Sequence, residues 1–309
     1  RLIDMVTVSV LLDAGAGPSW QYVSPGGQIL KSSEGLARAS LDLFLDGFFS
    51  TDCAMKTRVD SAALMSITDE GLARGLQVGV ANPLLGVANR AKLLRDLGKA
   101  LESHPDFFGK EVPRPGNIVD YLLSKSENNT VGLEHLWRAV SDGLSAIWPV
   151  QPNGTLRGDV WKHSRLYVSG KPGSDLVPFH KLTQWLVYSL VDVLHSYLGL
   201  QVKGCEALTG LPEYRNGGLL VDSGVIRLKD ESWLSQQVNV GTELVVEWRA
   251  LTVVLLDQLA ASLRKKLSVE LPLASVLEGG TWHAGRKMAA AKRQDGSSPI
   301  KVRLDGNVF

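Results

Sequence analysis

Apolar residues recur at helical spacing over most of the chain. The longest amphipathic pattern runs from Pro178 to Gly199, where a proline, favoured in a first helical turn, opens the segment. A second pattern, from Leu244 to Leu267, is apolar on nearly all sides, which predicts a central buried helix. Shorter periodic segments predict four more helices, which begin near Ser33, Pro83, Leu133 and Thr281.

Strand patterns are rare. Only Leu219–Ile226 and Ile300–Leu304 read as short strands, each with glycine or proline nearby. No internal repeat or low-complexity tract is present, and no linker clearly divides the chain. The sequence therefore predicts a mainly α protein with a short β element, folded as a single helical domain over residues 1–309.

Composition narrows the possible partners. The chain has 309 residues, 44% of them hydrophobic and 21% charged, with a formal net charge of +1. These values are ordinary for a globular protein and do not indicate binding to nucleic acid. The apolar runs are too short to span a membrane. Two distant cysteines, Cys53 and Cys205, support neither a disulfide framework nor a zinc site, so we expect a reducing, cytoplasmic location. The chain opens at Arg1 directly into an apolar segment, from which we expect that an upstream portion is missing.

The segment Leu211–Ile226 combines charged residues with conformationally flexible glycines. Polar residues lie close to three glycines, and Asp222 falls within an apolar run where a solvated carboxylate is not expected. This carboxylate is either a structural group bonded to turn amides or part of a functional site. The charged and polar members of the segment are Glu213, Arg215, Asn216 and Asp222.

Three other segments carry polar residues that a plain core would avoid. On the helix after Pro178, one face collects five polar or aromatic side chains, which indicates either a solvated face or a donor-rich wall. Glu247 and Arg249 open the apolar helix and fit either an internal salt bridge or a substrate contact. Gly279–Arg286 suits phosphate binding at a helix start, although such glycines also form ordinary caps. The five residues of the first face are His180, Lys181, Gln184, Trp185 and Tyr188.

Familiar catalytic signatures are missing from the sequence. The glycine-rich stretch Leu12–Trp20 lacks the Gly-Lys-Ser/Thr of a P-loop and the spacing of a dinucleotide fingerprint. No Gly-x-Ser-x-Gly elbow is present, and no two histidines have metal-ligand spacing. We expect neither a metal nor another cofactor.

Several long strings together resemble the uracil catabolism protein 4 family over the whole chain. They include Val177–Leu182, Thr209–Asp222, Glu247–Thr252 and Gly279–Arg286, in that order. Family members usually carry a further amino-terminal region with a His/Arg/Trp-rich motif, which this sequence lacks. A fainter similarity links His180, Asp222, Glu247 and neighbouring residues to the queuosine-nucleotide hydrolases, which implies a DNA-glycosylase-like helical fold.

The resemblance implies a place in uracil degradation, where a ribosylurea species must lose urea. It favours a metal-independent N-ribosyl hydrolase acting on ribosylurea or its 5′-phosphate, a small-molecule substrate. Because such cleavage passes through an oxocarbenium-like state, we assign Asp222 to stabilise that charge, Glu247 to activate water or bind the sugar, and His180 to protonate urea. Glu213, Arg215 and Asn216 are then interpreted as the scaffold or rim that holds Asp222, more than as independent chemistry. The expected substrate-binding residues are Lys181, Gln184, Trp185, Tyr188, Arg215, Asn216, Arg249, Trp282 and Arg286.

Three rival functions remain open from the sequence. A nucleic-acid glycosylase is disfavoured by the balanced charge and the lack of a basic stripe. A non-catalytic partner of the ring-opening enzyme would use the same residues as an interface, and an amidohydrolase would attack the urea group instead of the sugar bond. The oligomeric state is not predicted.

Overall fold

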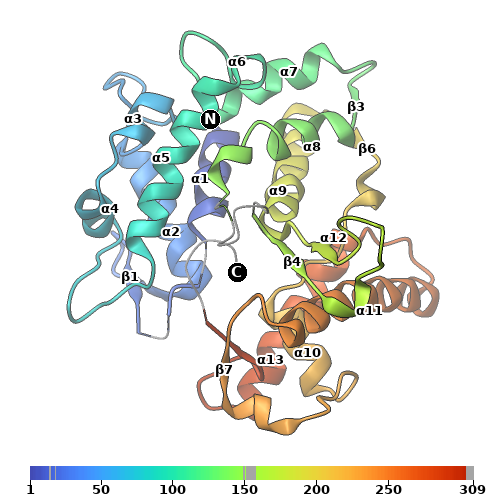
Figure 1. Cartoon of the computed structure of the whole chain (residues 1–309). Coiled ribbons are helices and arrows are strands. Elements are labelled where there is room, and N and C mark those ends of the chain that lie inside the picture. Colours follow the sequence, from blue (N-terminus) through green and yellow to red (C-terminus); the bar gives the residue numbers. More distant parts are fainter. Residues whose placement is uncertain (14, 18, 149, 151–157, 304–309) are drawn as a thin grey trace. The chain divides into compact units, whose positions relative to one another are not determined.

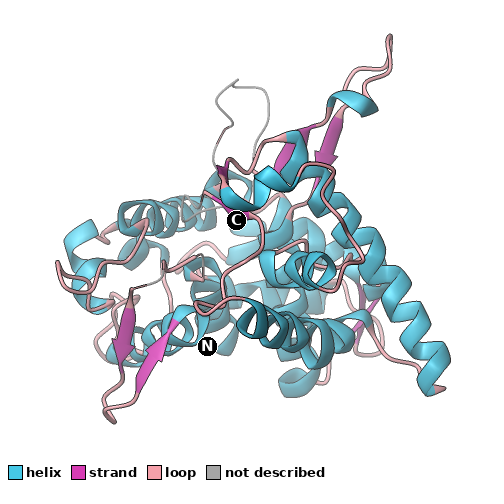
Figure 2. Cartoon of the chain, turned by 90° about the horizontal axis from the view of Figure 1, so that it is seen from below, coloured by secondary structure: helices cyan, strands magenta, loops and turns pink. Residues whose placement is uncertain are grey.

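The protein is mainly helical, as the sequence predicts. A computed structural model describes residues 1–13, 15–17, 19–148, 150 and 158–303. Helices dominate this part of the chain, and the strands are short and pair only in twos (Figure 2). Across the described residues, none of the helices combines the length and the apolar character needed to cross a membrane.

The chain folds into two compact units. The first comprises the described parts of Arg1–Val150 and Trp185–Cys205, and the second those of Gln151–Gln184 and Glu206–Leu304. Neither unit is one continuous stretch, because the chain leaves the first unit and later returns to it. The expectation of a single domain stays a prediction.

Helices build the first unit, and α3, α4 and α5 pack together within it (Figure 1). Its two small sheets are an antiparallel β1–β2 pair and a parallel β3–β6 pair. Its strands are β1 (Gln21–Val23), β2 (Ile29–Lys31), β3 (Thr130–Gly132) and β6 (Gln201–Lys203). Its helices are α1 (Leu2–Leu12), α2 (Ser32–Asp46), α3 (Ser61–Met65), α4 (Asp69–Gly75), α5 (Val87–Ser103), α6 (Pro105–Phe108), η1 (Pro115–Asn117), α7 (Ile118–Ser124), α8 (Leu133–Ser141), η2 (Ser145–Ile147) and most of α9 (Lys181–Leu198).

In the second unit, α10 packs against two longer helices. The helices α11 and α13 both pack on α10, and small pairs β4–β5 (antiparallel) and β7–β8 (parallel) complete the unit. Its strands are β4 (Val160–Lys162), β5 (Leu176–Pro178), β7 (Gln237–Val238) and β8 (Lys301–Val302). Its helical elements are η3 (Ser164–Leu166), α10 (Tyr214–Asp222), η5 (Glu231–Ser235), α11 (Glu243–Leu267), α12 (Leu273–Val276), the π-helix η6 (Leu277–Trp282) and α13 (His283–Lys292), while η4 (Cys205–Ala207) lies where the chain passes between the units.

Most predicted helices are confirmed, with small shifts at their ends. The pattern after Ser33 becomes α2, whose apolar face is buried and which ends at Gly47 in the left-handed conformation that glycine adopts easily. The helix predicted from Pro83 begins later, at Val87 in α5, after Gly86. The predicted strand Ile300–Leu304 is confirmed as β8, although Leu304 lies outside the described residues.

Two local predictions are wrong. The residues Leu219–Asp222, expected in a strand, form the last turn of α10, because Gly217 and Gly218 let this helix pack closely against other parts of the unit. A side chain at Gly217 would stand 2.7 Å from the ring of Trp248. The second error concerns α11, which has the predicted length but exposes 41% of Leu251 and 52% of Val254, so it is buried along one face and not all round.

Candidate functional site

A buried ion pair joins Asp159 to Arg249 in the second unit. The guanidinium donates two hydrogen bonds of 2.7 Å to the two carboxylate oxygens, and the side chains are only 6% and 1% exposed. Burial alone would raise the pKa of Asp159, but the charge and hydrogen bonds of Arg249, with further bonds from Trp161 and the Lys181 amide, lower it. Asp159 is therefore held as a carboxylate.

This pair fixes the starts of two helices. Asp159 accepts a hydrogen bond of 3.1 Å from the backbone N–H of Lys181, the first residue of α9, through its side chain. Arg249 donates from Nε to the carbonyl of Pro212, two residues before α10. Its guanidinium carbon lies 4.1 Å from the ring centre of Phe179. The internal salt bridge that the sequence left open for Arg249 is present, and its partner is Asp159, not the nearby Glu247.

His180 precedes α9 in a left-handed conformation with φ 47°. Few residues other than glycine and asparagine adopt this region, and such conformations gather at functional sites. Its backbone N–H donates to the carbonyl of Asp159 at 3.3 Å. Burial lowers the pKa of the half-buried imidazole, against the opposing effect of Asp159. A neutral His180 is better suited to accept a proton than to donate one, which changes its expected role.

Gln184 holds the connection that leads into α10. Its amide oxygen accepts from the backbone N–H of Thr209 at 2.7 Å, and its amide nitrogen donates to the hydroxyl of the same residue at 2.7 Å. All these atoms lie inside the second unit. Gln184 was expected to bind substrate, but its amide is occupied by these contacts, so the geometry gives it a positioning role.

Glu213 caps α10 with its side chain. One carboxyl oxygen accepts from the backbone N–H of Asn216 at 2.6 Å and the other from that of Arg215 at 2.9 Å. Burial raises the pKa of Glu213, although these hydrogen bonds and the charges of Arg215 and Lys181 act in the opposite direction. Carboxyl groups with raised pKa values are candidate proton donors. The capping hydrogen bonds fit the sequence interpretation of Glu213 as scaffold, and the raised pKa is a property that the sequence did not show.

Aromatic rings surround the next residue, Arg215. Its guanidinium carbon lies 5.0 Å from the ring centre of Tyr214 and 4.8 Å from that of Trp282. Arg286, on α13, has its guanidinium carbon 5.6 Å from the same Trp282 ring. Three predicted substrate-binding residues, Arg215, Trp282 and Arg286, are therefore gathered at the starts of α10 and α13.

Asn216 carries an acceptor that lacks a donor among the described residues. The residue is 2% exposed, and its amide nitrogen donates to the carbonyl of Leu211 at 3.0 Å. This bond fixes the direction of the amide, and its oxygen has no hydrogen-bond partner in the described part of the chain. Buried polar atoms are nearly always paired, so this oxygen can accept from a hydroxyl or N–H group of a ligand.

Asp222 ends α10 and is held by another arginine. Arg293 donates to both carboxylate oxygens, at 2.7 and 2.5 Å, and the Asp222 side chain is 5% exposed. Asp222 lies nine positions after Glu213, which is about 13.5 Å along a helix axis. The structure thus does not bring Asp222 to the Glu213 end of α10, and the catalytic role assigned to it stays a prediction.

Three predicted site residues remain, on α9 and α11. Glu247 is exposed on α11, while the adjacent Trp248 is buried and donates to the carbonyl of Gly217 at 3.0 Å. Trp185 and Tyr188 continue the Lys181 face of α9 but belong to the first unit. Their expected role as walls of the substrate pocket stays a prediction.

The glycines at Gly279 and Gly280 do not open a helix. They lie inside the π-helix Leu277–Trp282, which continues from α12 and runs directly into α13. Their N–H groups therefore belong to a continuing helix, and the expected phosphate site at a helix start is wrong here. Single π-helical turns occur often at functional sites, and this one positions Trp282.

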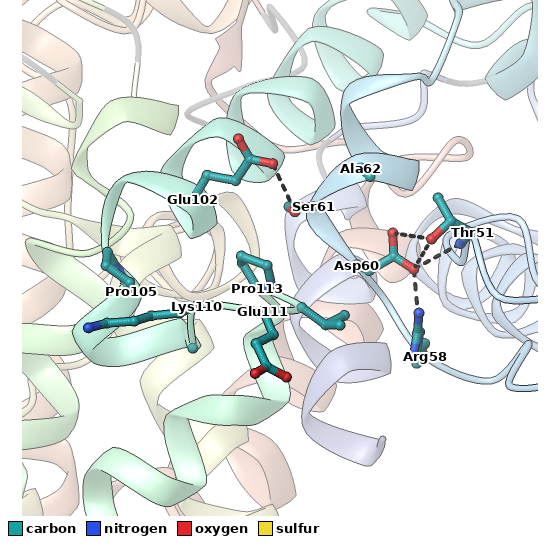
Figure 3. Close-up of a pocket in the computed structure, with 12 residues that line it drawn as sticks. Thr51, Arg58, Asp60, Ser61, Ala62, Glu102, Pro105, Lys110, Glu111 and Pro113 are labelled. Atoms are coloured by element: carbon teal, nitrogen blue, oxygen red, sulfur yellow. Dashed lines mark hydrogen bonds and ion pairs between the residues drawn. The ribbon is translucent and has the colours of Figure 1, made fainter.

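A separate pocket lies in the first unit (Figure 3). It has a volume of about 560 Å³, and no predicted site residue is among the residues that line it. Its buried charges satisfy one another, since Asp60 accepts from Thr51, Ala63 and Arg58. We therefore place the candidate site in the second unit. In the part of the chain that the structure describes, no three His, Cys, Asp or Glu side chains are arranged to hold a metal ion.

Comparison with known proteins identifies the family. A family model described as a protein of unknown function, DUF1688, matches residues 1–309. The chain belongs to this family. Uracil catabolism protein 4 of Lachancea kluyveri is 42% identical over 338 residues, which cover 100% of this chain and 77% of that protein. Protein urg3 of Schizosaccharomyces pombe is 43% identical over 317 residues, which cover 100% of this chain and 75% of that protein. The resemblance to the uracil catabolism protein 4 family is confirmed, whereas the similarity to queuosine-nucleotide hydrolases and a DNA-glycosylase-like fold stay predictions.

Proposed function

We propose that this DUF1688 protein acts in uracil catabolism as an N-ribosyl hydrolase that releases urea from ribosylurea or its 5′-phosphate. The name of the Lachancea kluyveri relative supports the pathway. The observation that carries the reaction type is Glu213, a carboxyl group with a raised pKa beside Lys181 and Arg215. A protonated carboxyl at this position can donate to a leaving nitrogen.

The reaction exchanges one bond at the sugar for another. The bond between ribosyl C1′ and the urea nitrogen breaks, and the oxygen of water bonds to C1′. Glu213 gives its proton to the departing urea, and neutral His180 takes a proton from the attacking water. The proton on His180 then returns to Glu213 through solvent, so the protein is unchanged after each turnover.

Two further groups would bind the substrate or position the reacting residues. The Asn216 amide oxygen, buried and without a donor among the described residues, can accept from a ribosyl hydroxyl or a urea N–H. The Asp159–Arg249 pair fixes the start of α9 through its bond to the Lys181 N–H and the approach to α10 through its bond to the Pro212 carbonyl. Preorganised groups of this kind lower the barrier without moving during the reaction.

Asp222 remains the alternative carboxylate. It has the charge needed to stabilise an oxocarbenium-like state, but both its oxygens already bind Arg293. Glu213 is the better candidate for proton transfer, because its hydrogen bonds come from backbone amides and its pKa is raised. Variants at the two positions separate these assignments.

The experiment is an analysis of products. The protein is incubated with ribosylurea and with ribosylurea 5′-phosphate, and urea, ammonia and the free sugar are each quantified. We expect urea and ribose, or ribose 5′-phosphate, in equal amounts. Ammonia formed in place of urea would assign an amidohydrolase, and no product from either compound would contradict a catalytic role.

A further inference from the structure

Arg215 differs from the other buried arginines. Four arginines are buried among the described residues: Arg58, Arg90, Arg215 and Arg249. Arg58 pairs with Asp52 and Asp60, Arg90 donates to the backbone carbonyls of Leu12, Leu85 and Gly15, and Arg249 pairs with Asp159. Within the described ranges, the guanidinium of Arg215 has neither a hydrogen bond nor an ion pair with any oxygen.

A buried guanidinium without an oxygen partner is costly to maintain. Arg215 is 9% exposed, and a guanidinium that keeps little contact with water and forms no hydrogen bond with the protein destabilises the folded state. The rings of Tyr214 and Trp282 offset part of this cost through cation–π contacts, but aromatic rings do not accept the directed hydrogen bonds of a guanidinium. Among the described residues, the N–H groups of Arg215 therefore lack the acceptor that each other buried arginine has.

The position of Arg215 is fixed by close packing. A side chain at Gly285 on α13 would come within 2.4 Å of the Arg215 carbonyl oxygen, so only glycine allows this approach. The following residue, Asn216, holds a buried amide oxygen that also has no hydrogen-bond partner in the described chain. Two consecutive, rigidly held residues thus present an unpaired donor group and an unpaired acceptor at the start of α10.

We propose that Arg215 binds the phosphoryl group of a 5′-phosphorylated ribosyl substrate. This inference rests on the proposed function for the identity of the sugar, but not for the binding of the anion. A phosphate monoester is a dianion with three oxygens that accept two parallel bonds from one guanidinium. Arg286, beside the same Trp282 ring, and Lys181, which acts on Glu213, add positive charge to this region.

The first arm of the test measures binding without catalysis. Inorganic phosphate is titrated against the protein by calorimetry and by the shift in melting temperature. We expect binding to the wild type, loss of at least tenfold in affinity in Arg215→Gln, and partial retention in Arg215→Lys. The matched control is Arg227→Gln, which removes an exposed arginine from the same unit and should bind phosphate like the wild type.

The second arm compares substrates. Arg215→Gln should lower kcat/KM for ribosylurea 5′-phosphate by about 10²-fold, mainly through KM, and that for unphosphorylated ribosylurea by less than about threefold. Circular dichroism of both Arg215 variants checks the fold, and Arg215→Lys replaces Arg215→Gln if the latter fails to fold. Equal losses on the two substrates, or unchanged phosphate binding in both variants, would overturn the inference. If neither substrate is cleaved, the proposed function fails, while phosphate binding still decides the role of Arg215.

Discussion

Arg249 binds Asp159 through two parallel hydrogen bonds of 2.7 Å, although 90 positions separate the two residues in the chain. The pair is buried, and it reaches the first residue of α9 and the carbonyl that precedes α10. The candidate site is therefore built on a long-range ion pair, and its stability depends on both partners.

Arg249→Met should lower the free energy of unfolding by about 3–5 kcal/mol, because it leaves the Asp159 carboxylate buried and unpaired. Urea denaturation measures the change. Lys162→Gln is the control: Lys162 meets Asp175 at 3.5 Å but is 58% exposed, so its loss should change stability by less than about 0.5 kcal/mol. Similar small effects for both variants would contradict a central role for the buried pair.

The Asp159–Arg249 pair also predicts a pH dependence of stability. The pKa of Asp159 is lowered in the folded protein, so its contribution is present above the unfolded pKa of about 3.9 and is lost as the pH falls through the lower folded value. Denaturation curves recorded from neutral to acidic pH should show this loss. In Asp159→Asn, that part of the acid destabilisation should be absent, and an identical slope in wild type and variant would argue against it.

Glu213 should control the alkaline limb of the rate profile. Because burial raises its pKa, the protonated acid should persist to higher pH than an ordinary glutamate, and kcat/KM should fall as the pH rises through this value. The stability contribution has the same sign: it is present below the unfolded pKa and is lost as the pH rises through the folded pKa. Rates of Glu213→Gln should be low and lack this limb. A limb that survives in the variant would assign it to another group.

Asp222→Asn tests whether this carboxylate is structural or catalytic. With both oxygens bound to Arg293, we expect a loss of stability of about 3 kcal/mol. The rate per folded molecule should fall less than about tenfold, measured below the melting transition. A loss of 10²–10³ in rate with unchanged stability would instead restore Asp222 as the catalytic carboxylate.

Gly285→Ala should force α13 away from α10. The added methyl group would lie 2.4 Å from the Arg215 carbonyl oxygen, and overpacking of this kind costs about 1–3 kcal/mol. Gly279→Ala is the matched control, because a side chain there meets no atom within 4 Å and alanine favours helix. Chemical denaturation should show opposite or clearly unequal changes, and equal changes would contradict the close contact.

The sequence predicts the helices better than the site. Periodic apolar spacing finds α2, α9 and α11 because each buries a face. It fails at α10, because the short, mostly apolar run Leu219–Asp222 has the pattern of a strand. No spacing in the sequence shows that Glu213 caps the first turn of this helix. At α11 the apolar pattern misled, because apolar residues on nearly all sides predicted a fully buried helix, yet Leu251 and Val254 are exposed.

The site residues also divide into those that the sequence predicted and those that it did not. Arg215, Trp282 and Arg286 come together as predicted substrate-binding candidates, because all three lie in motifs that combine glycine with charge or aromatic rings. Asp159 was missed, since a lone aspartate 90 residues before its partner carries no local signal. Glu213 was named but interpreted as scaffold, because a raised pKa depends on burial that only the folded chain reveals.

The central claim is tested most directly by urea release from ribosylurea and its 5′-phosphate, measured in parallel for the wild type and Glu213→Gln. The wild type should release urea and sugar in equal amounts. The variant, with a native circular dichroism spectrum, should be at least about 10²-fold slower, since it keeps a hydrogen-bond acceptor but has no proton to donate. Wild-type rates in Glu213→Gln, or ammonia in place of urea, would contradict the account.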